Sequence, residues 1–326
     1  MIGEADGPGP GFLRPATARA AGKVILLGEH AVVHGQPALA AGVDWGVTVG
    51  ISPASTRTLV PPASDPRVAR VVDEAARLLG IEPERGFTVS LGGDLPIAVG
   101  LGSSAALSVA LVRALASGIG RELSIAEITA HAHALERVFH GSPSGVDGTA
   151  AALGGLLWFE AGPPARSERV IAKSPFDLLV VLSGARHETA KTVGSLRERA
   201  TAAPEVYQPV FGAIGSLVSH ARAAIESGDL PLLGALMTMN HALLRACGVS
   251  TSELDATVEA GVEAGALGAK LTGGGGGGAV IALAGRDVDG LAGRLQARGY
   301  EVLRTRVGGE AQGLAQDPPI GYSGER

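Results

Sequence analysis

The sequence predicts an α+β protein built from two domains. Its 326 residues exceed what one small domain needs, and 46% of them are hydrophobic, which is enough to fill two cores. Short apolar runs alternate with longer helical patterns in both halves, as in proteins whose sheets are covered by helices. Glycine, proline and charged residues cluster over 162–174 and indicate a boundary. We expect domains at 17–170 and 171–312, with loose tails at 1–16 and 313–326.

The first half alternates strands and helices. Short apolar runs predict strands at 24–27, 43–51, 87–91 and 156–159. Residues 103–116 are almost wholly apolar, which predicts a helix buried on most sides. The next helix begins at the capping box of Ser124 and Glu127 and runs to about His140. A brief helix is expected at 149–153.

The second half follows the same logic. Strands are expected at 178–183, 279–284 and 300–307, and helices at 204–227, 230–246 and 288–298. Ser250 and Glu253 form a second capping-box pattern, which predicts a further helix to about Ala264. The glycine run 273–278 lies between a short polar segment and a strand, which favours a backbone loop next to a ligand over a flexible linker.

Composition excludes several classes of protein. The net charge of −5 and the lack of a basic run argue against a nucleic-acid surface. One cysteine, Cys247, excludes an intrachain disulfide and a cysteine-rich metal site, and its surroundings indicate a core position. No apolar run reaches the length of a membrane span, and the N-terminus does not look like a secretion signal, so we expect a cytoplasmic protein with no membrane partner.

The most informative stretch is PIAVGLGSSAA at 96–106. Gly100 and Gly102 allow a tight turn, and Ser103 and Ser104 open the apolar helix. A glycine turn that leads into a helix N-terminus is a ready phosphate site, because free N–H groups and the helix dipole favour an anion. Taken alone, a plain turn before a core helix explains the pattern equally well.

Two further stretches, GKVILLGEHAVVHGQPALAAG at 22–42 and ERVFHGSPSGVDG at 136–148, decide between these alternatives. Together with the glycine turn and KLTGGGGGGAVIAL at 270–283, they resemble the GHMP superfamily of galactokinase, homoserine kinase, mevalonate kinase and phosphomevalonate kinase. Within it they are most similar to the mevalonate kinases. The resemblance implies an N-terminal α/β domain of the ribosomal protein S5 domain 2 type and a ferredoxin-like C-terminal domain.

The resemblance also implies an activity. The expected reaction is transfer of phosphate from ATP, with Mg²⁺, to the C5 hydroxyl of mevalonate in isoprenoid precursor biosynthesis. Phosphomevalonate or homoserine is the alternative acceptor, and a non-catalytic binding or regulatory relative is the alternative class. The partner is then a small molecule, and because the family includes dimers, a homodimer is compatible with it.

Asp147 and Lys23 are the expected catalytic pair. Asp147 falls where the family places its catalytic base, although an Asp before a helix can also serve as its N-cap. In the family the lysine of the first motif reaches the active site, where its charge would keep Asp147 ionised; a lysine that opens an apolar strand can also extend to the surface.

The resemblance assigns the metal to Glu136 and the hydroxyl of Ser104, since Mg²⁺ takes few protein ligands besides phosphate oxygens. A solvated Glu136, or one paired with His140, is the alternative. Ser103 would contact phosphate or cap the helix. The expected ATP-binding residues are Pro96, Ala98, Val99, Gly100, Leu101, Gly102, Ser103, Ser104 and Ala105.

On the acceptor side the resemblance assigns His30 to a substrate oxygen and Glu29 to an orienting role. Thr189 follows a strand where the family has a substrate-side threonine, and Thr272 precedes the glycine run and is expected to face the site. Lys23 and Asp147 complete the expected substrate-binding set. Gly274 stands where the family commonly has alanine, which predicts a more mobile loop.

Overall fold

A computed structural model describes residues 13–97, 99–140, 143–162, 164–184 and 189–309. The strands are β1 (Ala16–Leu27), β2 (Pro37–Pro53), β3 (Thr58–Val60), β4 (Phe87–Gly93), β5 (Leu156–Glu160), β6 (Arg166–Arg169), β7 (Phe176–Leu182), β8 (Gly268–Leu271), β9 (Ala279–Leu283) and β10 (Glu301–Val307). The helices are the short 3₁₀ helix η1 (Ala31–His34), α1 (Pro66–Leu78), α2 (Ser103–Gly118), α3 (Ile125–His140), α4 (Val146–Leu153), α5 (Thr189–Ala202), α6 (Pro204–Ser227), α7 (Leu230–Ala246), α8 (Ser252–Glu263) and α9 (Val288–Ala297).

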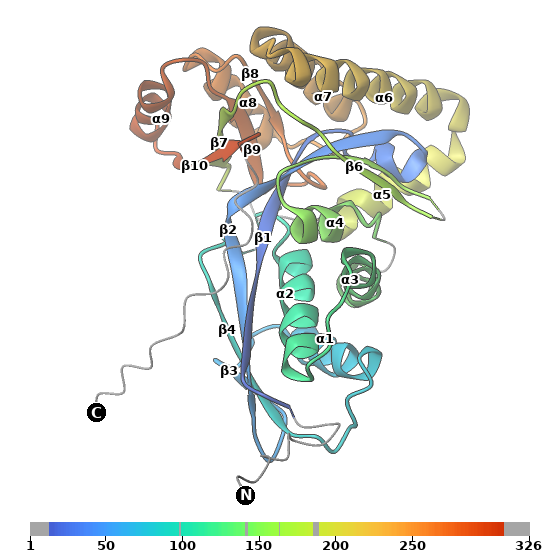
Figure 1. The fold of residues 1–326 in the computed structure, drawn as a ribbon. Helices are drawn as coiled ribbons and strands as arrows, with labels where there is room; N and C mark the ends of the chain where they lie inside the picture. The colour runs from blue at the N-terminus through green and yellow to red at the C-terminus, as the bar shows by residue number, and fades with distance from the viewer. Residues whose placement is uncertain (1–12, 98, 141–142, 163, 185–188, 310–326) are drawn as a thin grey trace, which may run out of the picture.

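In the described part of the chain, strands of the first half form a six-stranded sheet in the order β3-β4-β2-β5-β6, with β1 paired to β2. Helices α1, α2 and α3 cover one face of this sheet, and the long strands β1 and β2 run from one end of the molecule up to the helices of the second half, α6 and α7 (Figure 1). Because β2 spans 17 residues, it pairs with β4 through its second half and with β5 through its first.

The described strands of the second half form an antiparallel, four-stranded sheet in the order β10-β7-β9-β8. The two halves are joined through side chains as well as through the chain. The hydroxyl of Thr305 in β10 donates to Asp44 Oδ2 in β2 at 3.1 Å. Within the described residues, no helix combines the length and apolar character that crossing a bilayer requires.

Most predicted elements are confirmed. Helices α6 and α7 have the predicted bounds. The first capping box is present, with the Ser124 N–H donating to Glu127 Oε2 at 2.9 Å. The second is wrong, because Thr251 caps α8 by accepting from the Leu254 N–H at 3.3 Å.

Six of the described elements were not predicted: η1, α1, α5, β3, β6 and β8. Strand β6 lies inside the expected boundary segment and completes the first sheet by pairing with β5. The tails expected at 1–16 and 313–326 lie mostly outside the described residues; Leu13 is buried, and Ala16 opens β1.

Candidate active site

Lys23 and Asp147 form an ion pair at the centre of the site. Lys23 Nζ lies 3.0 Å from Asp147 Oδ1, and the Lys23 side chain is 3% exposed. An extension of Lys23 to the surface is therefore wrong. So is the N-cap interpretation of Asp147, because α4 begins at Val146 after Gly145 and Asp147 lies within its first turn. The Asp147 carboxylate remains about one-third exposed, at 35%, and so is accessible to a ligand.

Helix α4 holds Asp147 in place through its apolar face. Val146 and Ala150, one turn apart, pack in a small buried cluster with Ile25, Leu157 and Phe159. This cluster joins α4 to β1, the strand that carries Lys23. The same packing that buries the helix therefore sets the distance between the two charged groups.

The absence of a side chain on Gly102 lets the side chain of Lys23 pack directly against the backbone of the glycine turn. The φ of Gly102 is +75°, and a Cβ at this position would lie 2.8 Å from Lys23 Cγ. The backbone N–H of Lys23 donates to the Leu101 carbonyl at 2.9 Å, which fixes the turn against β1. Glycine is thus required here both by the backbone conformation and by the close approach of a side chain.

Glu136 is buried and lacks a hydrogen-bond partner. Its exposed fraction is 1%, and neither carboxylate oxygen has a partner. The pKa of Glu136 is raised to about 8, chiefly by burial and also by the negative charge of Asp147, while Lys23 opposes the shift. The solvated alternative is therefore wrong. A carboxylate in such a position is stabilised as an anion when a cation binds it.

Helix α2 presents an open N-terminus. Its N-cap is Gly102 and no side chain caps it, so the interpretation of Ser103 as the cap is wrong. Ser104 Oγ lies 2.9 Å from His140 Nε2, at the end of α3, and so His140 is the partner of Ser104 and not of Glu136. The free N–H groups and the helix dipole make this terminus suitable for phosphate.

The expected ATP loop is described except for Ala98. Leu101 and Ala105 are buried in the core, so they could meet a ligand only through their backbone. Gly100, Gly102, Ser103 and Ser104 are partly exposed, as are Pro96 and Val99 before them.

A second glycine loop lies against the first. A Cβ on Gly273 would lie 3.2 Å from the Gly100 carbonyl oxygen. The loop is held from outside, since the Gly276 N–H donates to the Val249 carbonyl and the Ser183 N–H to that of Gly278, both at 2.9 Å. The run 273–278 is thus a defined loop beside the phosphate turn, which agrees with the expectation that it is not a linker.

His30 lies between β1 and this loop. Its φ is +60°. Burial lowers the pKa of His30 to about 4, although a hydrogen bond with the backbone of Gly274 opposes the shift. Nε2 is buried and has no partner. A neutral imidazole with one unused nitrogen is available to a substrate oxygen.

Glu29 contacts two residues that the sequence analysis missed. It forms a buried ion pair with Lys270 of β8, and Asn240 Nδ2 of α7 donates to Glu29 Oε2 at 3.4 Å. Lys270 lies in β8, a strand that is buried throughout and was not predicted, so the local sequence did not mark this lysine as buried.

Of the two expected threonines, the structure describes the side chain of Thr272 only. Thr272 is fully buried, accepts from the Ile25 N–H at 2.9 Å and donates to the Ile25 carbonyl at 3.1 Å. Its contacts therefore do not support substrate binding, and they show that it joins β1 to the second half. Thr189 begins α5, and its side chain lies outside what the structure describes.

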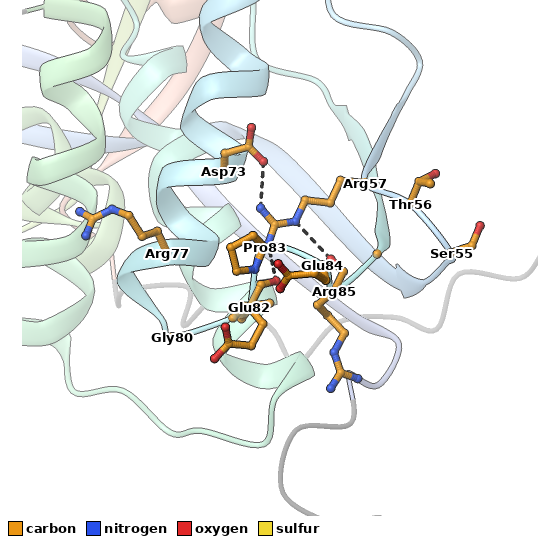
Figure 2. A pocket seen from close by; sticks show the side chains of 12 residues that line it. Ser55, Thr56, Arg57, Asp73, Arg77, Gly80, Glu82, Pro83, Glu84 and Arg85 are labelled. Carbon is orange, nitrogen blue, oxygen red and sulfur yellow. Dashed lines mark hydrogen bonds and ion pairs between the residues drawn. The ribbon is translucent and has the colours of Figure 1, made fainter.

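A pocket of about 770 Å³ lies elsewhere, beside the C-terminal end of α1 (Figure 2). Arg57 crosses it to Asp73 at 3.0 Å and to the Glu82 carbonyl at 2.8 Å. The other end of α1 is the one near the site, since Arg67 donates to the Phe139 carbonyl. A helix of 13 residues is about 20 Å long, so this pocket is remote from Lys23 and Asp147.

Comparisons with known proteins agree with this geometry. Family models match the chain twice, as the GHMP kinases N-terminal domain over 67–155 and as the GHMP kinases C-terminal domain over 221–301. Fold and site thus define a protein of the GHMP kinase class.

Similar proteins narrow the class. Mevalonate kinase of Thermococcus sibiricus is 34% identical, covering 90% of this chain and 96% of its own. That of Pyrococcus furiosus is 36% identical, covering 82% and 88%. The crystal structure of L. major mevalonate kinase in complex with R-mevalonate is 31% identical with a TM-score of 0.81, covering 90% and 96%. The chain belongs to the mevalonate kinase family.

Proposed function

We propose that the protein transfers the γ-phosphoryl group of ATP to the C5 hydroxyl of mevalonate, giving 5-phosphomevalonate and ADP. The observation that carries the proposal is the Lys23–Asp147 ion pair, 3.0 Å long, next to the open end of α2. A phosphoryl-transfer site needs a group that orients the attacking hydroxyl and donors that hold the phosphates, and these two elements lie together here.

Asp147 acts on the acceptor hydroxyl. Its carboxylate orients the hydroxyl and takes its proton as the new O–P bond forms and the bond from Pγ to the bridging oxygen breaks, with ADP as the leaving group. Lys23 keeps Asp147 ionised and holds the same hydroxyl by its ammonium group. His30 donates to another oxygen of mevalonate, and Thr189 stays a prediction for the same side.

The donor side is formed by backbone. N–H groups at the start of α2 and in the turn that follows Pro96 bind the phosphates of ATP, and the loop 273–278 lies next to them. Ala98, outside the described residues, stays a prediction for the same turn. The short approach of Gly273 to Gly100 supports this assignment.

Glu136 and Ser104 would hold Mg²⁺. The two unpartnered oxygens of Glu136 fit a hard cation, and a hydroxyl held by His140 fits a second ligand. Mg²⁺, when bound, neutralises charge on the transferred phosphate. Because Glu136 is buried, its negative charge is most favourable when Mg²⁺ is bound beside it.

A coupled assay of ADP release tests the proposal on mevalonate, phosphomevalonate, homoserine and galactose. We expect kcat/KM for mevalonate to exceed the others by at least about 10²-fold, because buried polar groups reject acceptors that leave them unpaired. Phosphomevalonate as the best acceptor would replace the proposed substrate, and no turnover of any acceptor would support a non-catalytic relative.

We also infer that the protein is cytoplasmic. A homodimer stays a prediction, and light scattering on the protein as it elutes from a size-exclusion column would decide it.

A further inference from the structure

Lys270 lies in the interior of the molecule, where a lone charge is strongly disfavoured. Its side chain is 0% exposed, and its ammonium group contacts Glu29, whose side chain is 1% exposed. The same Nζ donates to the backbone carbonyl of Leu271. An ammonium group at this depth keeps its charge only beside a carboxylate, so the two side chains act as one unit.

This unit joins the two halves of the chain at the end of β1. Glu29 follows β1, whereas Lys270 belongs to β8 and Asn240 to α7. Two residues beyond Lys270, the Thr272 hydroxyl forms hydrogen bonds with both the N–H and the carbonyl of Ile25. Residues 270–272 of the second half therefore hold the end of β1 and the residues that follow it.

The turn held in this way has an unfavourable backbone. Among the described residues, His30 is the only one other than glycine with a positive φ. Such a conformation persists only where the surrounding structure imposes it. Glu29 is the neighbour of His30 in the chain, so its pairing with Lys270 anchors the backbone directly before the strained residue.

Glu29 also lies within the influence of the catalytic lysine. Burial raises the pKa of Glu29, Lys270 lowers it most strongly, and Lys23 lowers it as well. Lys23 thus has two carboxylates in its surroundings, Asp147 at 3.0 Å and Glu29. Without Lys270, the buried Glu29 would lose the ammonium group that it contacts, and Lys23 would be the other ammonium group that acts on it.

Two buried polar atoms in and beside this unit are free to meet a ligand. Asn240 Oδ1 and His30 Nε2 are buried and have no hydrogen-bond partner. Asn240 is one of the three residues of the unit, and His30 is directly bonded to Glu29 along the chain. Buried atoms of this kind are costly unless a ligand satisfies them.

We propose that Lys270 is a positioning residue for the acceptor side of the site. Lys270 neutralises Glu29. As a result, Lys23 remains paired with Asp147, and the imidazole of His30 remains oriented toward the substrate. The inference rests on the proposed function, because Lys23, Asp147 and His30 meet the acceptor only if the protein is a kinase of this substrate class.

Lys270→Met tests it by steady-state kinetics with mevalonate and ATP. We expect kcat to fall by about 10²-fold and KM for mevalonate to rise, with KM for ATP unchanged, since a misplaced reacting group costs about that much. The control is Thr305→Val, which removes a part-buried contact between the halves that involves neither Glu29 nor Lys23, and is expected to lower stability but leave both KM values unchanged. Wild-type kinetics in Lys270→Met, or an equal rise of both KM values, would overturn the inference.

The double variant Glu29→Met/Lys270→Met tests whether Lys270 acts through Glu29 or contacts the substrate itself. Removing both charges leaves no isolated anion to attract Lys23, so kcat should recover by about tenfold over Lys270→Met alone. A double variant as slow as the product of the two single effects would instead show that Lys270 acts independently of Glu29.

Circular dichroism checks that the variants fold. If Lys270→Met is not recovered folded, Lys270→Gln, which keeps a donor next to Glu29, is compared by the same criteria. Wild-type protein that does not phosphorylate mevalonate contradicts the proposed function itself. Active wild type with an unaffected Lys270 variant contradicts only the role of Lys270.

Discussion

The carbonyl oxygen of Gly100 lies 3.2 Å from the point that a Cβ on Gly273 would occupy, so two glycine-rich loops from opposite halves of the chain meet at the start of α2. Neither loop could approach the other as closely with larger residues at this contact. In the proposed site, the meeting of these loops brings backbone from both halves of the chain to the phosphate end, whereas Lys23, Asp147 and His30 are assigned to the acceptor end. The predictions that follow use this division.

Asp147→Asn should abolish most turnover and leave nucleotide binding nearly intact. The amide keeps the shape of the side chain but cannot take the proton or balance Lys23, and such terms are worth about 10²–10⁴-fold in rate. The measurement is kcat together with calorimetric titration of ATP. A near-normal kcat would contradict the assignment of Asp147.

Glu136→Gln should raise the Mg²⁺ concentration for half-maximal activity by several-fold. A neutral amide is a poor ligand for a hard dication, and the two unpartnered oxygens of Glu136 are its assigned donors. Initial rates over a Mg²⁺ series at saturating mevalonate decide the matter. An unchanged titration would mean that the metal lies elsewhere.

His30→Ala should raise KM for mevalonate more than KM for ATP. His30, whose Nε2 has no hydrogen-bond partner, is assigned to the acceptor side in the proposed site, and the turn at Gly102 to the donor side. Matched titrations of both substrates give the ratio. An equal effect on the two KM values would remove His30 from substrate binding.

Acid should destabilise the wild-type protein through His30. Its pKa is about 4 in the folded protein, below the ordinary value of 6.5, so the unfolded chain binds more protons between these limits. The contribution is complete above pH 6.5 and is lost as pH falls toward 4, by on the order of 3 kcal/mol.

The comparison variant for this effect is His30→Asn, because asparagine does not titrate and tolerates a positive φ. Urea unfolding of both proteins at a series of pH values measures the difference. Parallel stability curves from pH 6.5 to 4 would contradict a buried, neutral His30.

Gly102→Ala should lose both stability and activity, whereas Gly120→Ala should lose only stability. Both glycines have positive φ, +75° and +69°, so both variants carry a conformational cost of about 1–2 kcal/mol. Only at Gly102 does the added Cβ meet Lys23, 2.8 Å from its Cγ, while Gly120 has nothing within 4 Å. Equal kcat values in the two variants would show that Lys23 tolerates the displacement.

Local signals in the sequence were sufficient for much of the fold. Helices α6 and α7 were predicted with their observed bounds. Proline marks the first turn of each, and a glycine follows the last turn of each, at Gly228 and Gly248. Helix α1 was omitted although it carries the same kind of signal: Asp65 caps it, accepting from the Arg67 N–H at 2.9 Å, and Pro66 is its first residue. The short strands β3, β6 and β8 have no periodicity of their own and form because a neighbouring strand offers hydrogen bonds.

The sequence by itself determined the motifs, the glycine turn at the start of α2 and the residue types on which phosphoryl transfer depends. Only the tertiary structure decided which charges meet. Lys23 and Asp147 were expected together from the resemblance, but the burial of Glu136 and the pairing of Glu29 with Lys270, 241 residues further along the chain, had no local signal. The reason is physical. Charged side chains are usually exposed, so a sequence pattern predicts a solvent-facing position for them. The free energy that stabilises one in the interior comes from a partner that the packing of both sheets brings close.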